Sequence, residues 1–92
     1  MNKIIKHLQS SSFSLRLRGI FECVAKRNLA PEEQIALIAL LQDNCRVDAR
    51  CVRDFAAAAL DHLGICKYAG DNPDVYLLIQ DMPYITQDYF EC

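Results

Sequence analysis

Apolar residues recur at steps of three and four along most of this 92-residue chain, which is the spacing of helices that bury one face. The clearest stripe is Val52, Phe55, Ala56, Ala59, Leu60 and Leu63. Proline, glycine and serine interrupt the pattern and divide the chain into segments. We therefore predict an all-α protein with helices over residues 2–9, 12–28, 31–43, 48–63 and 73–81, and with residues 82–92 as a tail or a short last helix.

Capping residues set the expected ends of the later helices. Asp48 should cap the helix that starts there, because its short carboxylate can accept a hydrogen bond from the first turn. Gly64 should end the same helix in the left-handed conformation. Asn72 followed by Pro73 is a typical helix start.

The segment Val52–Gly64 recurs in weaker form 35 residues upstream, over Leu17–Ala25. A self-similar helical unit at this period indicates stacked helix pairs, in which each pair packs against its neighbours. Residues 35–41, in the helix between the two copies, are apolar almost all round. We expect that helix to lie in the middle of the stack, covered on more than one side.

The later copy begins with Val52-Arg53, continues through four alanines and ends with Leu63-Gly64. This pattern resembles the second helix of HEAT repeats. The resemblance covers roughly residues 2–64 as two repeats, with residues 73–81 as half of a third. It implies one domain over residues 1–92, a short right-handed α-solenoid of about two and a half helix pairs, whose second helices line a concave binding face.

The same offset aligns polar and small positions on the second helices of the two pairs. Their rows should adjoin on one face, opposite the apolar stripe, where charged and small side chains mix as they do in a groove. We take this face as the candidate protein-binding surface, although merely solvated side chains would show the same pattern. Its candidate residues are Leu15, Glu22, Lys26, Arg50, Asp54, Ala57 and Asp61.

Charge is unevenly distributed along the chain, although the net charge is only −2. Residues 1–30 hold six basic residues against one acid, and residues 61–92 hold six acids against one lysine. A linear stack would keep these parts separate and so have one basic and one acidic end, which would also allow self-association. Aromatics interleaved with acids form an alternative binding surface near the C-terminus: Asp81, Tyr84, Asp88, Tyr89 and Glu91.

No residues in the sequence have the spacing of a catalytic or metal site. His62 and Cys66 are four apart, as a Cys–His nucleophile pair could be, but at a helix end we interpret them as dipole and packing residues. The five cysteines include no Cys-x-x-Cys pair, so we expect no bound metal. Without a glycine-rich phosphate loop we expect no nucleotide cofactor, and we predict that the protein is not an enzyme.

Hydropathy and charge also indicate in which compartment the protein lies and what kind of partner it binds. No apolar run reaches the roughly 18–20 residues of a membrane span, and we find no signal peptide, so we expect reduced thiols in the cytoplasm. The first third is basic, but nucleic-acid binding is not expected because the acidic last third would repel phosphate. The expected partner is another protein, and a basic one if the acidic end takes part.

Two functions fit these observations. The first is a non-catalytic protein–protein interaction module, a scaffold or adaptor that binds a protein segment on its concave face. The alternative is a small acidic stoichiometric inhibitor, such as an immunity protein or antitoxin, that neutralises a basic toxin or nuclease. Small size and acidity suit the second function, but they suit many other proteins as well.

Overall fold

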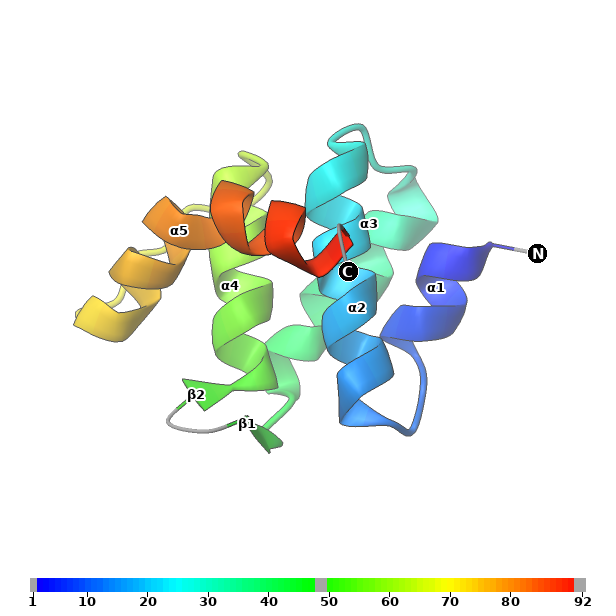
Figure 1. Ribbon diagram of the computed structural model, residues 1–92, viewed down its shortest axis with the longest axis horizontal. Coiled ribbons are helices and arrows are strands. Elements are labelled where there is room, and N and C mark those ends of the chain that lie inside the picture. The colour runs from blue at the N-terminus through cyan, green and yellow to red at the C-terminus, as the bar shows by residue number, and fades with distance from the viewer. Residues whose placement is uncertain (1, 48–49, 91–92) are drawn as a thin grey trace.

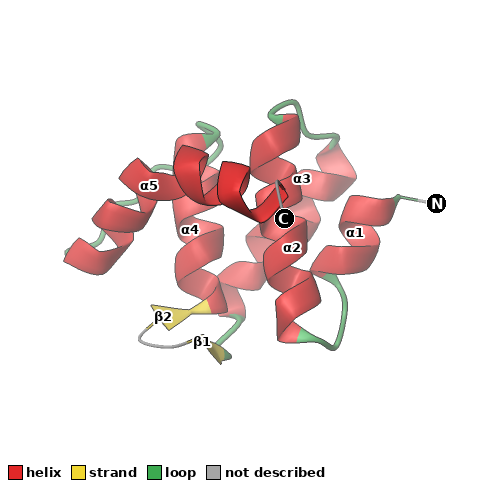
Figure 2. Ribbon diagram, viewed as in Figure 1, coloured by secondary structure: helices red, strands yellow, loops and turns green. Residues whose placement is uncertain are grey.

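Helices account for most of the chain, which confirms the predicted all-α class (Figures 1 and 2). The computed structural model describes residues 2–47 and 50–90, and for Val47 and residues 84–90 it describes the backbone alone. The elements in chain order are α1 (Lys3–Leu8), α2 (Phe13–Lys26), α3 (Pro31–Ala39), the 3-10 turn η1 (Leu40–Gln42), β1 (Arg46–Val47), β2 (Arg50–Cys51), α4 (Val52–His62) and α5 (Pro73–Phe90).

α2 and α4 form the centre of the fold (Figure 1). In that view α1 lies beside α2, α3 lies behind them, and α5 crosses in front of α4 and α2. α1 contacts α3, and α2 contacts α4. The core fills the space between the helices, where the ring of Phe21 from α2 meets the edge of Phe55 from α4 at a centroid distance of 5.9 Å.

α4 begins at Val52, later than the predicted residue 48, because the preceding chain forms a short hairpin. β1 and β2 pair in antiparallel fashion, with Arg46 opposite Cys51 and Val47 opposite Arg50. Cys51 is the N-cap, and its backbone N–H donates to the Asp54 carboxylate at 2.8 Å. Asp54 thus takes part in the capping expected of Asp48, which lies outside the described residues.

α5 is longer than predicted, since residues 82–90 continue the helix rather than forming a tail or a separate helix. Pro83 in its interior removes a backbone hydrogen bond and disfavours the helix. Three side chains at helical spacing before it, Val75, Leu78 and Met82, are all buried. Their burial holds the chain in place up to the proline. Residues 91–92 lie outside the described part of the chain.

α3 is covered on one face only, so the expectation that it is buried on more than one side is wrong. Ala36 and Leu37 are buried, whereas Ile35 exposes 68% of its surface and Ile38 exposes 39%. In a third helix pair, residues 73–81 would extend the row formed by α1 and α3. α5 packs mainly against α4 and α2 instead.

Small residues let the central helices approach one another closely. Ala56, Ala58 and Ala59 of α4 are fully buried, and α4 contacts α2, α3, α5 and η1. Gly19 serves the same purpose between α2 and α1, because a Cβ at this position would lie 2.9 Å from the backbone nitrogen of Leu8. Larger side chains at these positions would push the helices apart.

Ala59→Leu should therefore lower the free energy of unfolding by about 1–3 kcal/mol through overpacking. Ala25→Leu is the matched control, since Ala25 is exposed on α2 and alanine and leucine have similar helix propensities. Urea denaturation of the two variants and the parent chain measures the difference. Equal midpoints for Ala59→Leu and the parent would show that the alanine run is not closely packed.

Candidate functional site

Two adjoining hollows lie between α4, η1 and the segment that leads to α5. Their volumes are about 170 Å³ and 210 Å³, and both are lined by Leu41, Ala57 and Tyr68. The other lining residues are Arg53, Asp54, Leu60, Cys66, Lys67, Ala69, Asn72 and Val75. Because the hollows share three residues, we treat them as one depression and call it the α4 groove.

Hydrogen bonds fix the wall of the groove that faces α4. The chain leaves α4 through Gly64, whose φ of 74° confirms the predicted left-handed helix end. The Asp61 carboxylate then accepts a hydrogen bond from the backbone N–H of Tyr68 at 2.7 Å. The Tyr68 hydroxyl accepts another hydrogen bond from the backbone N–H of Asn72 at 2.8 Å. The rings of Tyr68 and Tyr76 pack edge to face, with their centroids 5.2 Å apart. Backbone and side chain together therefore hold Tyr68 beside α4.

The groove combines apolar side chains with charged ones. Leu60 and Val75 are buried and Ala57 is half-buried, while Arg53 and Lys67 are exposed. The two hollows, of about 170 Å³ and 210 Å³, together reach only the lower end of the roughly 300–1,000 Å³ of typical small-molecule sites. The space suits one or two side chains of a protein partner better than a cofactor.

The α2 residues of the predicted binding face contact α1 and α3. Glu22 forms an ion pair with His7 of α1, and Lys26 forms one with Glu33 of α3 at 2.7 Å. Leu15, the remaining α2 candidate, exposes 40% of its surface. The structure thus explains Glu22 and Lys26 as residues that join helices.

The α4 residues of the predicted face gather at the groove. Asp54 and Ala57 line it, and Asp61 supports it through Tyr68. Arg50 is half-buried on β2, and its Nε has no hydrogen-bond partner among the described residues. The predicted rows on α2 and α4 therefore have different neighbours and do not form one continuous surface.

Leu41 and Tyr68 are central to the groove but are absent from the candidates chosen by sequence. Leu41 belongs to η1, and Tyr68 to the irregular segment between α4 and α5. In the sequence Leu41 falls in a helix that we expect to be covered, so it is not considered as part of a surface, and helical periodicity carries no signal in the segment that holds Tyr68. An aromatic residue between Gly64 and Gly70 is the single local hint, and it does not reveal the contact with α4.

The alternative acidic surface falls on α5. Asp81 is exposed there. The side chains of Tyr84, Asp88 and Tyr89, and all of Glu91, lie outside the described residues. The backbone of α5 nevertheless places positions 81, 84, 88 and 89 on one continuous helix.

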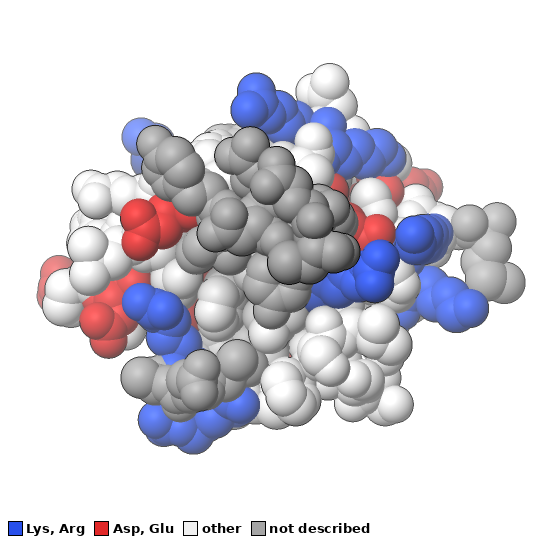
Figure 3. Space-filling view, viewed as in Figure 1, with Lys and Arg blue, Asp and Glu red and all other residues white. Residues whose placement is uncertain are grey.

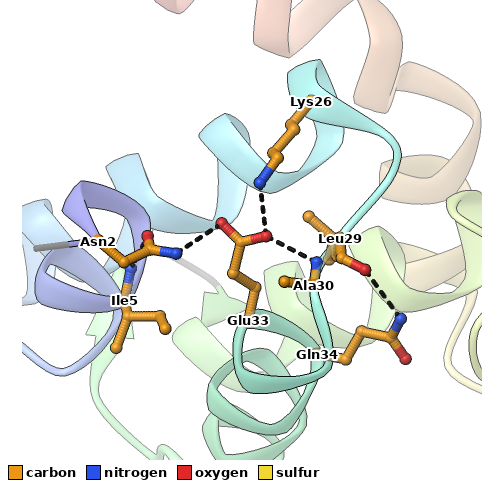
Figure 4. A network of polar contacts seen from close by, with 7 residues as sticks. All are labelled: Asn2, Ile5, Lys26, Leu29, Ala30, Glu33 and Gln34. Carbon is orange, nitrogen blue, oxygen red and sulfur yellow. Dashed lines mark hydrogen bonds and ion pairs between the residues drawn. The ribbon is translucent and has the colours of Figure 1, made fainter.

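Glu33 is a buried carboxylate at which three helices meet (Figure 4). It accepts hydrogen bonds from the Lys26 ammonium at 2.7 Å, from the backbone N–H of Ala30 at 2.8 Å and from the Asn2 amide at 3.1 Å. Asn2 also caps α1 by accepting from the backbone N–H of Ile5. One charge thus ties the start of α1 to the end of α2 and the start of α3.

These contacts hold the pKa of the Glu33 carboxyl below its ordinary value. The hydrogen bond from Lys26 has the largest effect, and the bonds from Ala30 and Asn2 act in the same direction, while burial opposes them. In the sequence Glu32 and Glu33 look alike, as acids in the first turn of a helix. Glu32 is exposed and Glu33 is 1% exposed, so they differ in role.

The residues considered for nucleophilic or metal chemistry are dispersed. Cys66 lines the α4 groove, whereas His62 lines a separate hollow of about 340 Å³ with Arg27, Asn28 and Leu63. Among the described residues, no group of three or more His, Cys, Asp or Glu side chains could hold a metal ion. None of the helices in this part of the chain has both the length and the apolar character needed to cross a membrane.

No protein-family model matches the chain, and no curated protein or solved structure is similar enough to count as a match. The function is therefore inferred from the geometry of the α4 groove.

Replacing Glu33 should make the protein less stable and less sensitive to acid. Because folding lowers the pKa of this carboxyl, its contribution is complete above the unfolded value of about 4.3 and disappears as the pH falls through the lower folded value. Glu33→Gln should reduce the free energy of unfolding at pH 7 by about 1.5–3 kcal/mol and weaken its decline below pH ~4.3. Urea unfolding at several pH values measures both effects.

Glu32→Gln is the control for this experiment, because it makes the same change one residue away at an exposed position. Its unfolding curves should follow those of the parent chain at every pH. If Glu33→Gln behaves like Glu32→Gln, the buried carboxylate does not stabilise the junction of the three helices.

The cysteines should differ in reactivity in the folded protein. Burial, together with the negative charges of Glu33 and Glu22, raises the pKa of the Cys23 thiol to about 12. Cys66 is exposed. Iodoacetamide at pH ~8 should therefore modify Cys66 in the folded protein and Cys23 only after unfolding, as peptide mass spectrometry would show. Equal rates at the two thiols in the native protein would contradict the packing of Cys23.

Proposed function

We propose that this chain is a non-catalytic protein-binding module that holds a segment of another protein in the α4 groove. The proposal rests on one observation, the two joined hollows that share Leu41, Ala57 and Tyr68. Protein partners commonly anchor an aromatic or aliphatic side chain in such an apolar depression, with polar groups around it.

The rigidity of the groove supports this proposal. Asp61 and Asn72 hold Tyr68 in place through hydrogen bonds within the chain itself. A wall that is already ordered loses little conformational entropy when a partner binds. Arg53 and Lys67, which are exposed at the lining, suit a carboxylate or a backbone carbonyl on the partner segment.

We further propose that the helices form a short HEAT-like solenoid of two stacked pairs. The contact of α1 with α3 and that of α2 with α4 support it, because first helices and second helices should each form a layer. α5 departs from the repeat by crossing the layer of second helices. We therefore propose that the partner binds beside α5, in the α4 groove, and not along the whole layer formed by α2 and α4. The free thiols at Cys23, Cys45, Cys51 and Cys66 favour a reducing compartment such as the cytoplasm.

A separate observation favours the alternative function of a stoichiometric inhibitor. Asp71, Asp74 and Asp81 are all exposed on α5 or just before it. A basic toxin or nuclease would be attracted to this region rather than to the groove. The two functions therefore predict different contact sites on the protein.

Site-specific photo-cross-linking in cells tests the proposed function. A photoreactive residue at position 57 should give a discrete adduct, because Ala57 lies in the groove, whereas one at position 35 on the outer side of α3 should not. The captured protein, once purified, should bind the parent chain at least ~10-fold more tightly than it binds Ala57→Glu, which places a charge among apolar side chains.

Unchanged binding of the captured protein to a folded Ala57→Glu variant would overturn the groove as the binding site. An adduct formed from position 77 with a basic enzyme that the chain inhibits would instead establish the inhibitor function. Circular dichroism of each variant shows whether the helices are retained.

A further inference from the structure

The outer face of α5 carries a stripe of acidic and apolar side chains. Asp74, Leu77 and Asp81 follow one another at steps of three and four residues, so they lie on one face of the helix. All three are exposed, and Leu77 exposes 52% of its surface. We call Asp74, Leu77 and Asp81 the acidic stripe. The buried residues Val75, Leu78 and Met82 each lie one position further along, so the side that packs into the core is about 100° around the helix.

The sequence segment that carries the acidic stripe contains no positive charge of its own, although Arg53 and Lys67 are exposed in the neighbouring α4 groove. Residues 68–90 contain no Lys, Arg or His, and exposed Asp71 adds a further acid just before α5. Positions 84 and 88, a tyrosine and an aspartate, lie seven residues after positions 77 and 81. The backbone of α5 therefore places them along the same side of the helix as the acidic stripe. The alternative acidic surface expected from the sequence is thus part of one longer helical face.

The other end of the molecule has the opposite charge. Lys3 and Lys6 are both exposed on α1, and residues 1–8 contain no acid. On the neighbouring α2, Arg18 is exposed three residues after Leu15, which is an exposed apolar residue. We call these four residues the basic end. It matches the acidic stripe in combining like charges with an exposed leucine.

The two regions lie toward opposite ends of the longest axis of the protein. This axis measures 37 Å, with α1 near one end and the start of α5 near the other (Figure 1). Figure 3 shows acidic atoms at the left end of this view and basic atoms at the right end, with some acidic atoms also at the upper right and some basic atoms at the left. Basic atoms also gather at the lower left, near the β1–β2 hairpin.

This separation prevents the two regions from neutralising each other within one molecule. Exposed charges interact over about 10 Å at 0.1 M ionic strength, much less than the length of the protein. A second copy can bring its basic end directly against the acidic stripe. We propose that the protein self-associates head to tail, with the acidic stripe of one copy on the basic end of the next.

A second copy is the occupant that the described surface favours, because the chain itself supplies the complementary charge and an apolar residue on both sides. Such a contact uses different patches on the two copies, so it leaves one patch free at each end and permits growth beyond a dimer. Exposed ion pairs contribute little individually, so association should be weak, with a dissociation constant on the order of 1 mM. This inference does not depend on the function proposed for the α4 groove.

Sedimentation equilibrium of the purified full chain gives the first test. At ~0.1 M ionic strength the weight-average mass should rise above that of the 10.5-kDa monomer as the concentration approaches ~1 mM. At ~1 M salt, where exposed charges are screened within about 3 Å, the mass should return to that of the monomer. A monomer at every concentration in low salt would overturn the proposal.

Charge exchange then tests whether the two named regions are in contact. Reversing the acidic stripe with Asp74→Lys and Asp81→Lys should abolish association, and so should reversing the basic end with Lys3→Glu and Lys6→Glu. The variant that carries all four changes should associate again, because its ends are complementary in the opposite sense. All four side chains are exposed, so the helices should be retained, as circular dichroism would show.

Two control variants distinguish pairing of these regions from a general effect of net charge and from binding in the groove. Glu32→Lys reverses an exposed acid at the start of α3, close to α1, so it adds positive charge near the basic end and should not weaken association. Ala57→Glu should leave association unchanged, because the α4 groove takes no part. A folded fourfold variant that remains monomeric, or an equal loss of association in Glu32→Lys, would show that the acidic stripe and the basic end do not pair.

Discussion

The absence of side-chain bulk on α4 is the constraint on which the rest of the structure depends. Ala56, Ala58 and Ala59 are fully buried, so the neighbouring helices can approach the backbone of α4 closely. The fourth alanine of the run, Ala57, is half-exposed and lines the α4 groove. The same run therefore packs the centre of the protein and leaves the space in which a partner side chain could lie. Because the buried side of α4 is closely packed, the helix cannot shift, and the position of the groove on its other side is fixed as well.

Ion pairs join the helices that precede α4. His7 pairs with Glu22, Arg16 with Asp43 at 2.6 Å, and Lys26 with Glu33 at 2.7 Å. The carboxylates are buried or nearly so, which means that losing one partner would leave a charge poorly solvated. These pairs therefore fix the positions of α1, α3 and the turn after η1 more firmly than exposed pairs would. They also explain why charged residues that resemble a binding surface in the sequence have structural roles.

Local patterns predicted the helices well and their mutual contacts less well. The stripe from Val52 to Leu63 is visible because helix burial repeats at a fixed spacing, and Gly64 marks its end for a stereochemical reason. The buried role of Glu33 depends on Asn2, 31 residues away in the sequence, so it has no local signature. The hairpin before α4 was missed because strands of two residues carry no periodicity. The length of α5 was missed because Pro83 is a helix breaker unless burial before it outweighs the lost hydrogen bond.

The candidate site shows the same division between local and long-range information. Asp54, Ala57 and Asp61 follow from the face of one helix, and the structure places all three at the α4 groove. The prediction that α2 residues lie beside them assumed a particular rotation of α2 relative to α4. The 35-residue offset between the two similar segments does not specify that rotation. The opposite wall comes from Tyr68, whose position depends on a hydrogen bond to Asp61. An aspartate chosen as a binding residue thus serves to build the site.

The course of α5 explains how the two ends of the protein can carry different contacts. Leu78 and Met82 of α5 are buried in the core and Asp74 and Asp81 are exposed, so this helix covers α4 and α2 with a charged outer surface. A contact between copies at such a surface depends on charge rather than on a continuous apolar interface, and salt should weaken it. The α4 groove lies beside this helix and is lined by Val75 from its buried side. The binding proposed for the groove and the association proposed for the acidic stripe would therefore use different sides of one helix, so one would not require the other.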